Sequence, residues 1–179
     1  MTTLAIKQAS LALLLALPGL AAQAVDAYSL SAGYGDRVSQ LKTSMIWHWD
    51  KRWFTEGDWH LTGYWEANAS LMLAHASGGN TFFEAGITPV FRLRPNASGS
   101  TQPYWEAGIG PHLVSNSEVD PDRDLGSPLL MAELLGFGVT FGDKTRYDVG
   151  YRLQHLSNWG FKDPDNGLTL HEVRLTYLY

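Results

Sequence analysis

The feature that most constrains the fold is a period-2 alternation of apolar with polar or small side chains after residue 24. Because successive side chains of a β-strand point to opposite faces, this pattern indicates strands with one apolar and one polar face. A run at 129–141 is apolar at nearly every position, so its faces stay unassigned. The eight expected strands are residues 27–35, 38–49, 59–73, 82–93, 104–114, 129–141, 147–158 and 168–179.

The first 24 residues have the layout of a secretory signal peptide. Lys7 precedes an apolar run at 11–22, and Ala22-Gln23-Ala24 supplies the small-residue pattern of a cleavage site. The apolar run is too short to span a bilayer, and nothing after it approaches the roughly 20 apolar residues of a spanning helix. We therefore expect residues 1–24 to be cleaved and residues 25–179 to form a single domain.

Aromatic content helps to decide what surrounds the strands. The chain has 7 Trp, 8 Tyr and 7 Phe, and an exported, alternating, aromatic-rich chain is typical of a transmembrane barrel. A secreted β-sandwich is the alternative. The polar face of residues 59–73 is too continuous for a soluble core, however, and the last run ends at Tyr179, as the final strands of outer-membrane proteins do. The prediction is an all-β fold, an eight-stranded antiparallel transmembrane β-barrel.

A sheet spans a bilayer only by closing so that no backbone edge faces lipid, and the polar faces then point into the barrel. Pro89 and Pro111 fall on the outer face, where each costs a ladder hydrogen bond unless a bulge or strand end relieves it. We expect an ionic interior formed by Glu66, Glu84, Arg92, Glu106, Arg152, Glu172 and Arg174.

The orientation follows from a periplasmic N-terminus, which makes odd-numbered strands run outward. Residues 142–144 are then a tight internal turn and residues 115–127 a long external loop, as in bacterial barrels. The end of the run 147–158 lies near the external leaflet of a Gram-negative outer membrane, which is lipopolysaccharide.

Charge and cysteine content exclude several partners. Without residues 1–24 the chain has 12 Lys and Arg against 18 Asp and Glu, a net charge of about −6 that disfavours nucleic acid. The absence of cysteine excludes a disulfide framework and a thiolate zinc site. We expect neither a metal nor a cofactor.

The strongest chemical signal is His155-Leu156-Ser157, at the end of a run whose outer positions are apolar. Counting by twos from Leu153 puts His155 and Ser157 on that apolar face, close enough for an imidazole to take the serine proton. His-x-Ser alone is a weak motif. Polar groups on a lipid-facing surface are expensive, however, and are usually functional. The pair therefore predicts a Ser-His site that meets a lipid substrate from the side.

The chain resembles the lipid A 3-O-deacylase (PagL) family over essentially all of the expected mature protein. The resemblance rests on His155-Leu156-Ser157-Asn158-Trp159-Gly160, Lys162, Pro164, Gly167, and the segments 47–51, 61–65, 89–91, 106–110 and 125 onwards. It implies an outer-membrane barrel that hydrolyses the ester of the 3-position acyl chain of lipid A. It also implies His155 as base, Ser157 as nucleophile, and Asn158 with backbone N–H groups toward Gly160 as the oxyanion stabiliser.

One position departs from the family's pattern, which places a glutamate two residues after the loop glycine to orient the histidine. Here that position is Thr169, whose hydroxyl can accept a hydrogen bond from imidazole but carries no charge. His171 shares its face, while Glu172 has the right chemistry but points into the lumen unless a bulge rotates it outward. The third member of the site stays unassigned between Thr169 and Glu172.

Two other functions fit the same fold. A non-catalytic barrel, structural or adhesive, needs no reactive pair, and a lipid A acyltransferase adds a chain where a deacylase removes one. The expected partners are lipopolysaccharide, with lipid A as substrate, and the outer membrane itself. The oligomeric state is open, a homodimer included.

Overall fold

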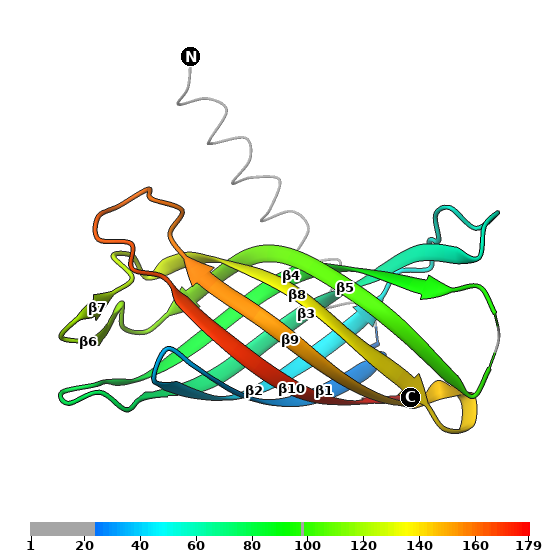
Figure 1. Ribbon diagram of the computed structural model, residues 1–179, viewed down its shortest axis with the longest axis horizontal. Coiled ribbons are helices and arrows are strands. Elements are labelled where there is room, and N and C mark those ends of the chain that lie inside the picture. Colours follow the sequence, from blue (N-terminus) through cyan, green and yellow to red (C-terminus); the bar gives the residue numbers. More distant parts are fainter. Residues whose placement is uncertain (1–23, 98) are drawn as a thin grey trace, which may run out of the picture.

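Eight antiparallel strands close into a barrel in the computed structural model, which describes residues 24–97 and 99–179. The expected signal peptide lies outside the described residues except for Ala24. The barrel strands are β1 (Ala27–Gly35), β2 (Val38–His48), β3 (Trp59–Ala74), β4 (Thr81–Pro95), β5 (Thr101–Val114), β8 (Leu129–Phe141), β9 (Tyr147–Ser157) and β10 (Leu168–Leu178) (Figure 1). Each strand pairs with its neighbour along this series, and β1 pairs with β10, which confirms the predicted all-β barrel. None of the described helices could cross a bilayer.

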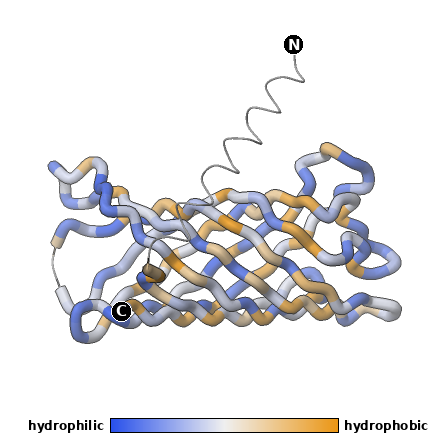
Figure 2. Tube along the Cα trace, turned by 180° about the vertical axis from the view of Figure 1, so that it is seen from behind, coloured by the Kyte–Doolittle hydropathy of each residue, from blue (hydrophilic) through white to orange (hydrophobic). Residues whose placement is uncertain are grey.

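The closing seam joins the first and last strands in an unbroken register from Ala27 opposite Leu178 to Tyr34 opposite His171. The seam is tight at its end, because a Cβ on Gly35 would lie 2.1 Å from the carbonyl oxygen of Thr169. Figure 2 shows hydrophobic and hydrophilic residues alternating along the strands, as the sequence predicted. In β8, whose faces the sequence left open, the odd residues from Leu129 to Phe137 point outward and the even ones inward.

The two prolines share one gap in the ladder between β4 and β5. Pairing runs from Glu84 to Gly86 and resumes at Val90, and the intervening residues 87–89 and 109–111 are not paired with each other, while the register is unchanged. Both strands are longer than expected, β4 reaching Pro95 and β5 starting at Thr101. A local break therefore accommodates both prolines, with no bulge.

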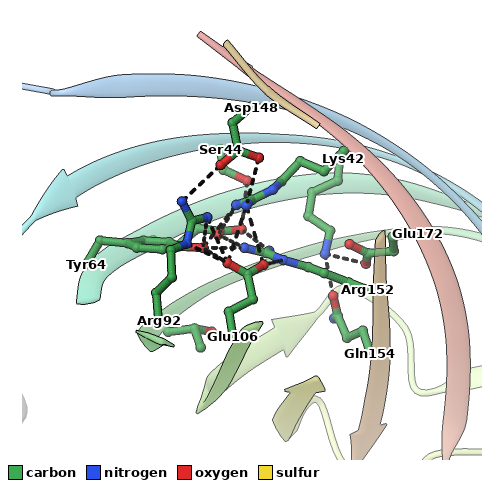
Figure 3. A network of polar contacts seen from close by, with 12 residues as sticks. Lys42, Ser44, Tyr64, Arg92, Glu106, Asp148, Arg152, Gln154 and Glu172 are labelled. Atoms are coloured by element: carbon green, nitrogen blue, oxygen red, sulfur yellow. Dashed lines mark hydrogen bonds and ion pairs between the residues drawn. The ribbon is translucent and has the colours of Figure 1, made fainter. Parts of the chain in front are cut away.

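The middle of the lumen is an ionic network, as predicted. Glu106 accepts hydrogen bonds from Arg152 Nε at 2.7 Å and Arg92 Nη2 at 2.8 Å. Arg152 also bonds to Glu66 at 2.8 Å, and Figure 3 shows Arg92, Glu106 and Arg152 converging. Buried charges are tolerated when they are paired and hydrogen-bonded. These paired side chains fill the middle of the lumen, so the outer face is where a catalytic site is sought.

Above the ionic layer, at the end that carries β9's last residues, the lumen is sealed by an apolar cluster. Its buried members are Val38, Met72, Phe82, Val114, Val119, Leu125, Leu130, Ala132, Leu156, Leu168 and Leu170. Val119 and Leu125 come from residues 115–127, which the sequence assigned wholly to a loop. That assignment was wrong in part, because β6 (Glu118–Asp120) and β7 (Arg123–Asp124) form a small hairpin there (Figure 1). Burial of these two side chains fixes the hairpin over the lumen.

Candidate active site

His155 and Ser157 lie at the end of β9 on the outer face of the barrel. Leu156 between them is fully buried in the apolar cluster, and Leu168, its register partner on β10, is buried beside it. These two inward side chains fix the direction in which their neighbours point. His155 is half-buried, while Ser157 is only 7 % exposed, so the serine is recessed in the outer surface instead of open to lipid.

Thr169 on β10 holds the histidine. It is the register partner of His155, and its Oγ1 lies 2.8 Å from His155 Nδ1. Gly167, with φ +63°, lies beside the ring atom between the two nitrogens, since a Cβ there would be 2.8 Å from His155 Cε1. If Nδ1 carries the proton and donates to Thr169, Nε2 is left free to accept one.

The histidine and the serine are not hydrogen-bonded to each other in this structure. Across residues 24–97 and 99–179, the Ser157 hydroxyl makes no side-chain hydrogen bond, and His155 bonds only to Thr169. Catalytic hydrogen bonds are often long without substrate and tighten only in the Michaelis complex. The geometry places the two groups on one face, two residues apart.

The expected oxyanion donors sit in the loop that joins β9 to β10, and both are engaged within the protein. Asn158 Nδ2 donates to the carbonyl oxygens of Leu125 at 2.8 Å and Lys162 at 2.7 Å. Asp165 accepts from the backbone N–H of Asn158 at 3.0 Å and from that of Gly160 at 2.8 Å. The Asn158 side chain thus ties the loop to the segment that follows β7.

Glu172 does not reach the histidine. It is 0 % exposed, lies in the lumen, and pairs with Lys42 (Figure 3). The β9–β10 register is continuous, so no bulge turns it outward. His171 faces outward but its Nδ1 bonds to the Tyr151 hydroxyl at 2.5 Å. Of the residues considered for the third position, only Thr169 contacts the imidazole.

Two acidic residues near the site were not recognised as such from the sequence. Asp36, in the turn between β1 and β2, accepts a hydrogen bond from the Thr169 N–H at 2.7 Å and pairs with Arg123 at 2.8 Å. Glu133 on β8 is the register partner of His155 and accepts from Trp159 Nε1 at 2.7 Å. A charge interrupting an apolar strand was a signal for Glu133. Asp36 gave none beyond its place in a turn.

Within the described residues, no three His, Asp or Glu side chains gather in an arrangement that could hold a metal ion.

A closed eight-stranded barrel with an apolar outer face has the architecture of an outer-membrane β-barrel, and a histidine and a serine lie two residues apart on that outer face. The comparisons with known proteins agree. The family described as Lipid A 3-O-deacylase (PagL) matches residues 39–178, and this chain belongs to that family. Lipid A deacylase PagL of Pseudomonas aeruginosa is 33 % identical over 152 residues, 85 % of each chain. Lipid A deacylase PagL of Bordetella bronchiseptica is 32 % identical over 116 residues, 65 % of this chain and 57 % of the relative.

Solved structures give the same result. The crystal structure of the outer membrane enzyme PagL superposes with a TM-score of 0.76 at 30 % identity, covering 86 % of this chain and 99 % of that one. Neisserial surface protein A matches with a TM-score of 0.54 at 11 % identity, covering 86 % of this chain and 94 % of that one. The second likeness concerns the fold alone.

Proposed function

We propose that this outer-membrane protein deacylates lipid A through a Ser157 nucleophile and a His155 base. The chain is a lipid A 3-O-deacylase, an ester hydrolase, as its family defines. The assignment of its machinery is carried by one observation. His155 and Ser157 share the outer face at the end of β9, and Thr169 occupies His155 Nδ1, which leaves Nε2 for the serine.

The reaction divides into two ester cleavages. Ser157 Oγ attacks the carbonyl carbon of the 3-position ester while His155 Nε2 takes the hydroxyl proton. The tetrahedral intermediate collapses, and the imidazolium returns its proton to the departing 3-oxygen of the sugar. Water, deprotonated by His155, then attacks the carbonyl carbon of the acyl-serine. Collapse of this second tetrahedral intermediate releases the 3-hydroxy fatty acid, and the imidazolium returns its proton to Ser157 Oγ.

For the oxyanion we propose Asn158, the residue after the nucleophile, and the backbone N–H of Gly160, three residues after it. Their present partners are loop carbonyls and Asp165, so a bound ester carbonyl must take over one of these donors. Gly160 supports this assignment because a side-chain position there is open, with nothing within 4 Å. A donor of this kind typically contributes about 10²–10³ in rate.

The substrate enters sideways in this proposal. Lipid A forms the outer leaflet, and the site lies on the lipid-facing wall at the end where the β9–β10 loop and the β6–β7 hairpin lie (Figure 1). The proposed machinery, Ser157, His155, Asn158 and Gly160, comes from one chain, so a second copy is not needed to complete it.

The test is mass spectrometry of lipid A from cells that express the full chain or its variants. The unsubstituted protein should remove the mass of one 3-hydroxy acyl chain, whereas an acyltransferase would add mass and a non-catalytic barrel would change nothing. Ser157→Ala and His155→Ala should each abolish the loss, since removing such a member costs several orders of magnitude. Ser117→Ala, in the strand-connecting segment before β6, is the matched control and should retain activity.

Folding must be checked for each variant by the shift in gel mobility on heating. A folded Ser157→Ala protein that still removes the acyl chain would contradict the nucleophile assignment. If lipid A loses the acyl chain both in cells that express Ser157→Ala and in cells that express the Ser117→Ala control, another residue must be the nucleophile.

A further inference from the structure

We propose that Asp36 is a positioning residue for His155, acting through Thr169. The inference rests on the proposed Ser-His chemistry, in which His155 becomes positively charged in each transition state. An imidazole in that role usually has a third group that orients it and stabilises its charge. Thr169 supplies orientation but no charge, and the nearest carboxylate on its far side is Asp36.

The contacts form a continuous chain across the barrel seam. His155 Nδ1 lies 2.8 Å from Thr169 Oγ1, and the Thr169 N–H donates to Asp36 Oδ2 at 2.7 Å. Arg123 Nη1 forms an ion pair with the same oxygen at 2.8 Å, and it also donates to the carbonyl oxygen of Gly167 at 3.3 Å. One threonine therefore joins the imidazole to a carboxylate, and the carboxylate in turn is fixed by an arginine.

The electrostatics point the same way. Burial raises the pKa of the Asp36 carboxyl, but the Thr169 N–H, Arg123 and the charge of His155 together hold it below its ordinary value. Asp36 is therefore ionised at neutral pH and stays ionised well into the acid range. Its side chain is 37 % exposed, so the attraction is screened and its effect on the imidazole is moderate.

Other charged groups surround His155, and they separate the proposal from its rivals. Glu133 faces the ring from β8, but its carboxylate is engaged by the Trp159 indole, and no contact links it to Nδ1 among the described residues. The neighbouring elements carry further charged or titratable groups: Arg123 and Asp124 on β7, His171 on β10, and Lys162, Asp163 and Asp165 in the β9–β10 loop, while Glu172 and Arg174 of β10 are buried in the lumen. Of the carboxylates in residues 24–97 and 99–179, Asp36 alone bonds to Thr169, the residue that holds Nδ1.

Asp36→Asn is a clean test of charge at this position. Asp36 has φ +50°, and asparagine is among the residues that adopt this conformation readily. The amide oxygen can still accept from the Thr169 N–H, so the contact is retained while the charge is lost.

The readout is the pH dependence of 3-hydroxy fatty acid release by the full chain in detergent micelles. Without the negative charge the imidazolium is less stable, so the apparent pKa of the acid limb of kcat/KM falls. We expect a fall of about 0.7 unit with a kcat about five-fold lower. Arg123→Gln should move the acid limb in the opposite direction, because it removes a positive charge. Asp36→Glu keeps the negative charge, so its acid limb should lie closer to that of the unsubstituted protein than the limb of Asp36→Asn does.

A merely structural role would not produce opposite shifts. If Asp36 and Arg123 only dock the hairpin, both variants lose amplitude with an unmoved acid limb, and the proposal is overturned. The same holds if Glu133→Gln shifts the limb and Asp36→Asn does not. Asp122→Asn, an exposed carboxylate in the same hairpin, is the charge control and should match the unsubstituted protein. If Asp36→Asn does not fold, the Arg123→Gln shift still decides.

Failure of the proposed function would look different. In that case the unsubstituted protein releases no fatty acid, or Ser157→Ala releases it normally. An active protein that needs Ser157 but gives superimposable profiles for Asp36→Asn and the control refutes the positioning role alone.

Discussion

Replacing Thr169 by valine should lower kcat about ten-fold, because the substitution removes the hydroxyl that contacts His155. Valine keeps the shape and the β-branch of threonine but cannot bond to His155 Nδ1, which lies 2.8 Å from Oγ1 in the unsubstituted protein. The backbone N–H that donates to Asp36 survives the substitution. The variant therefore removes one contact and leaves the rest of the chain of contacts in place.

The size of the effect combines two losses. A neutral hydrogen bond contributes about 0.5–1.5 kcal/mol. Without a partner at Nδ1 the ring proton is also shared between both nitrogens, so roughly half of the neutral imidazole is in the wrong tautomer for taking the Ser157 proton. Since about 1.4 kcal/mol is ten-fold in rate, the two losses together lower kcat about ten-fold.

The assay is the initial rate of 3-hydroxy fatty acid release from lipid A in mixed micelles, with kcat and KM separated. Thr169→Ser, which keeps the hydroxyl, is the matched control and should stay within about three-fold of the unsubstituted protein. The loss in Thr169→Val should fall on kcat, because the contact acts on the base and not on substrate binding. A folded Thr169→Val protein with unchanged kcat would show that the hydroxyl does not hold the catalytic ring.

Three further outcomes follow from the same contacts. Glu172→Gln should leave the specific activity of the folded protein within about two-fold. It should destabilise the barrel by about 3 kcal/mol, because the buried Lys42 loses its ion-pair partner. The temperature of the heat-induced gel shift measures this loss. Gly167→Ala should lower kcat more than about ten-fold at unchanged β content, because φ is +63° and the new Cβ lies 2.8 Å from His155 Cε1; an unaffected rate would disprove the close approach. Hydrogen exchange by NMR should find the Thr169 amide protected from neutral pH down to the ordinary carboxyl value of 3.8 and released only below it, because the lowered pKa of Asp36 keeps its acceptor ionised there; release between pH 7 and 5 would contradict this.

The barrel could be predicted from the sequence because a closed sheet imposes a local rule on every strand. Alternation fixed the eight strands to within a few residues, and parity alone placed Glu172 in the lumen and His155 on the outer face. The β6–β7 hairpin was missed because strands of three and two residues are too short for a period to register. Its position depends on Val119 and Leu125 filling the top of the lumen, a fact of packing and not of pattern.

The candidate site, like the fold, could be predicted from the sequence only where it depends on local spacing. The spacing of His155 and Ser157 is local and was read from the strand, whereas the third member was left unassigned between Thr169 and Glu172. The Asp36 contact joins residues 133 positions apart, across a seam whose register exists only after closure. The near-burial of Ser157 likewise depends on its surroundings in the closed barrel, which no local spacing describes.

The seam between β1 and β10 also sets the order in which the contacts around His155 can form. The turn that carries Asp36 is made early in synthesis, and Thr169 and His155 are made last, so the three meet only when the final strand zips onto the first. Before β10 pairs with β1, the proposed base therefore lacks its link to the Asp36 carboxylate. Under the proposed mechanism, barrel closure and completion of the catalytic machinery are one event.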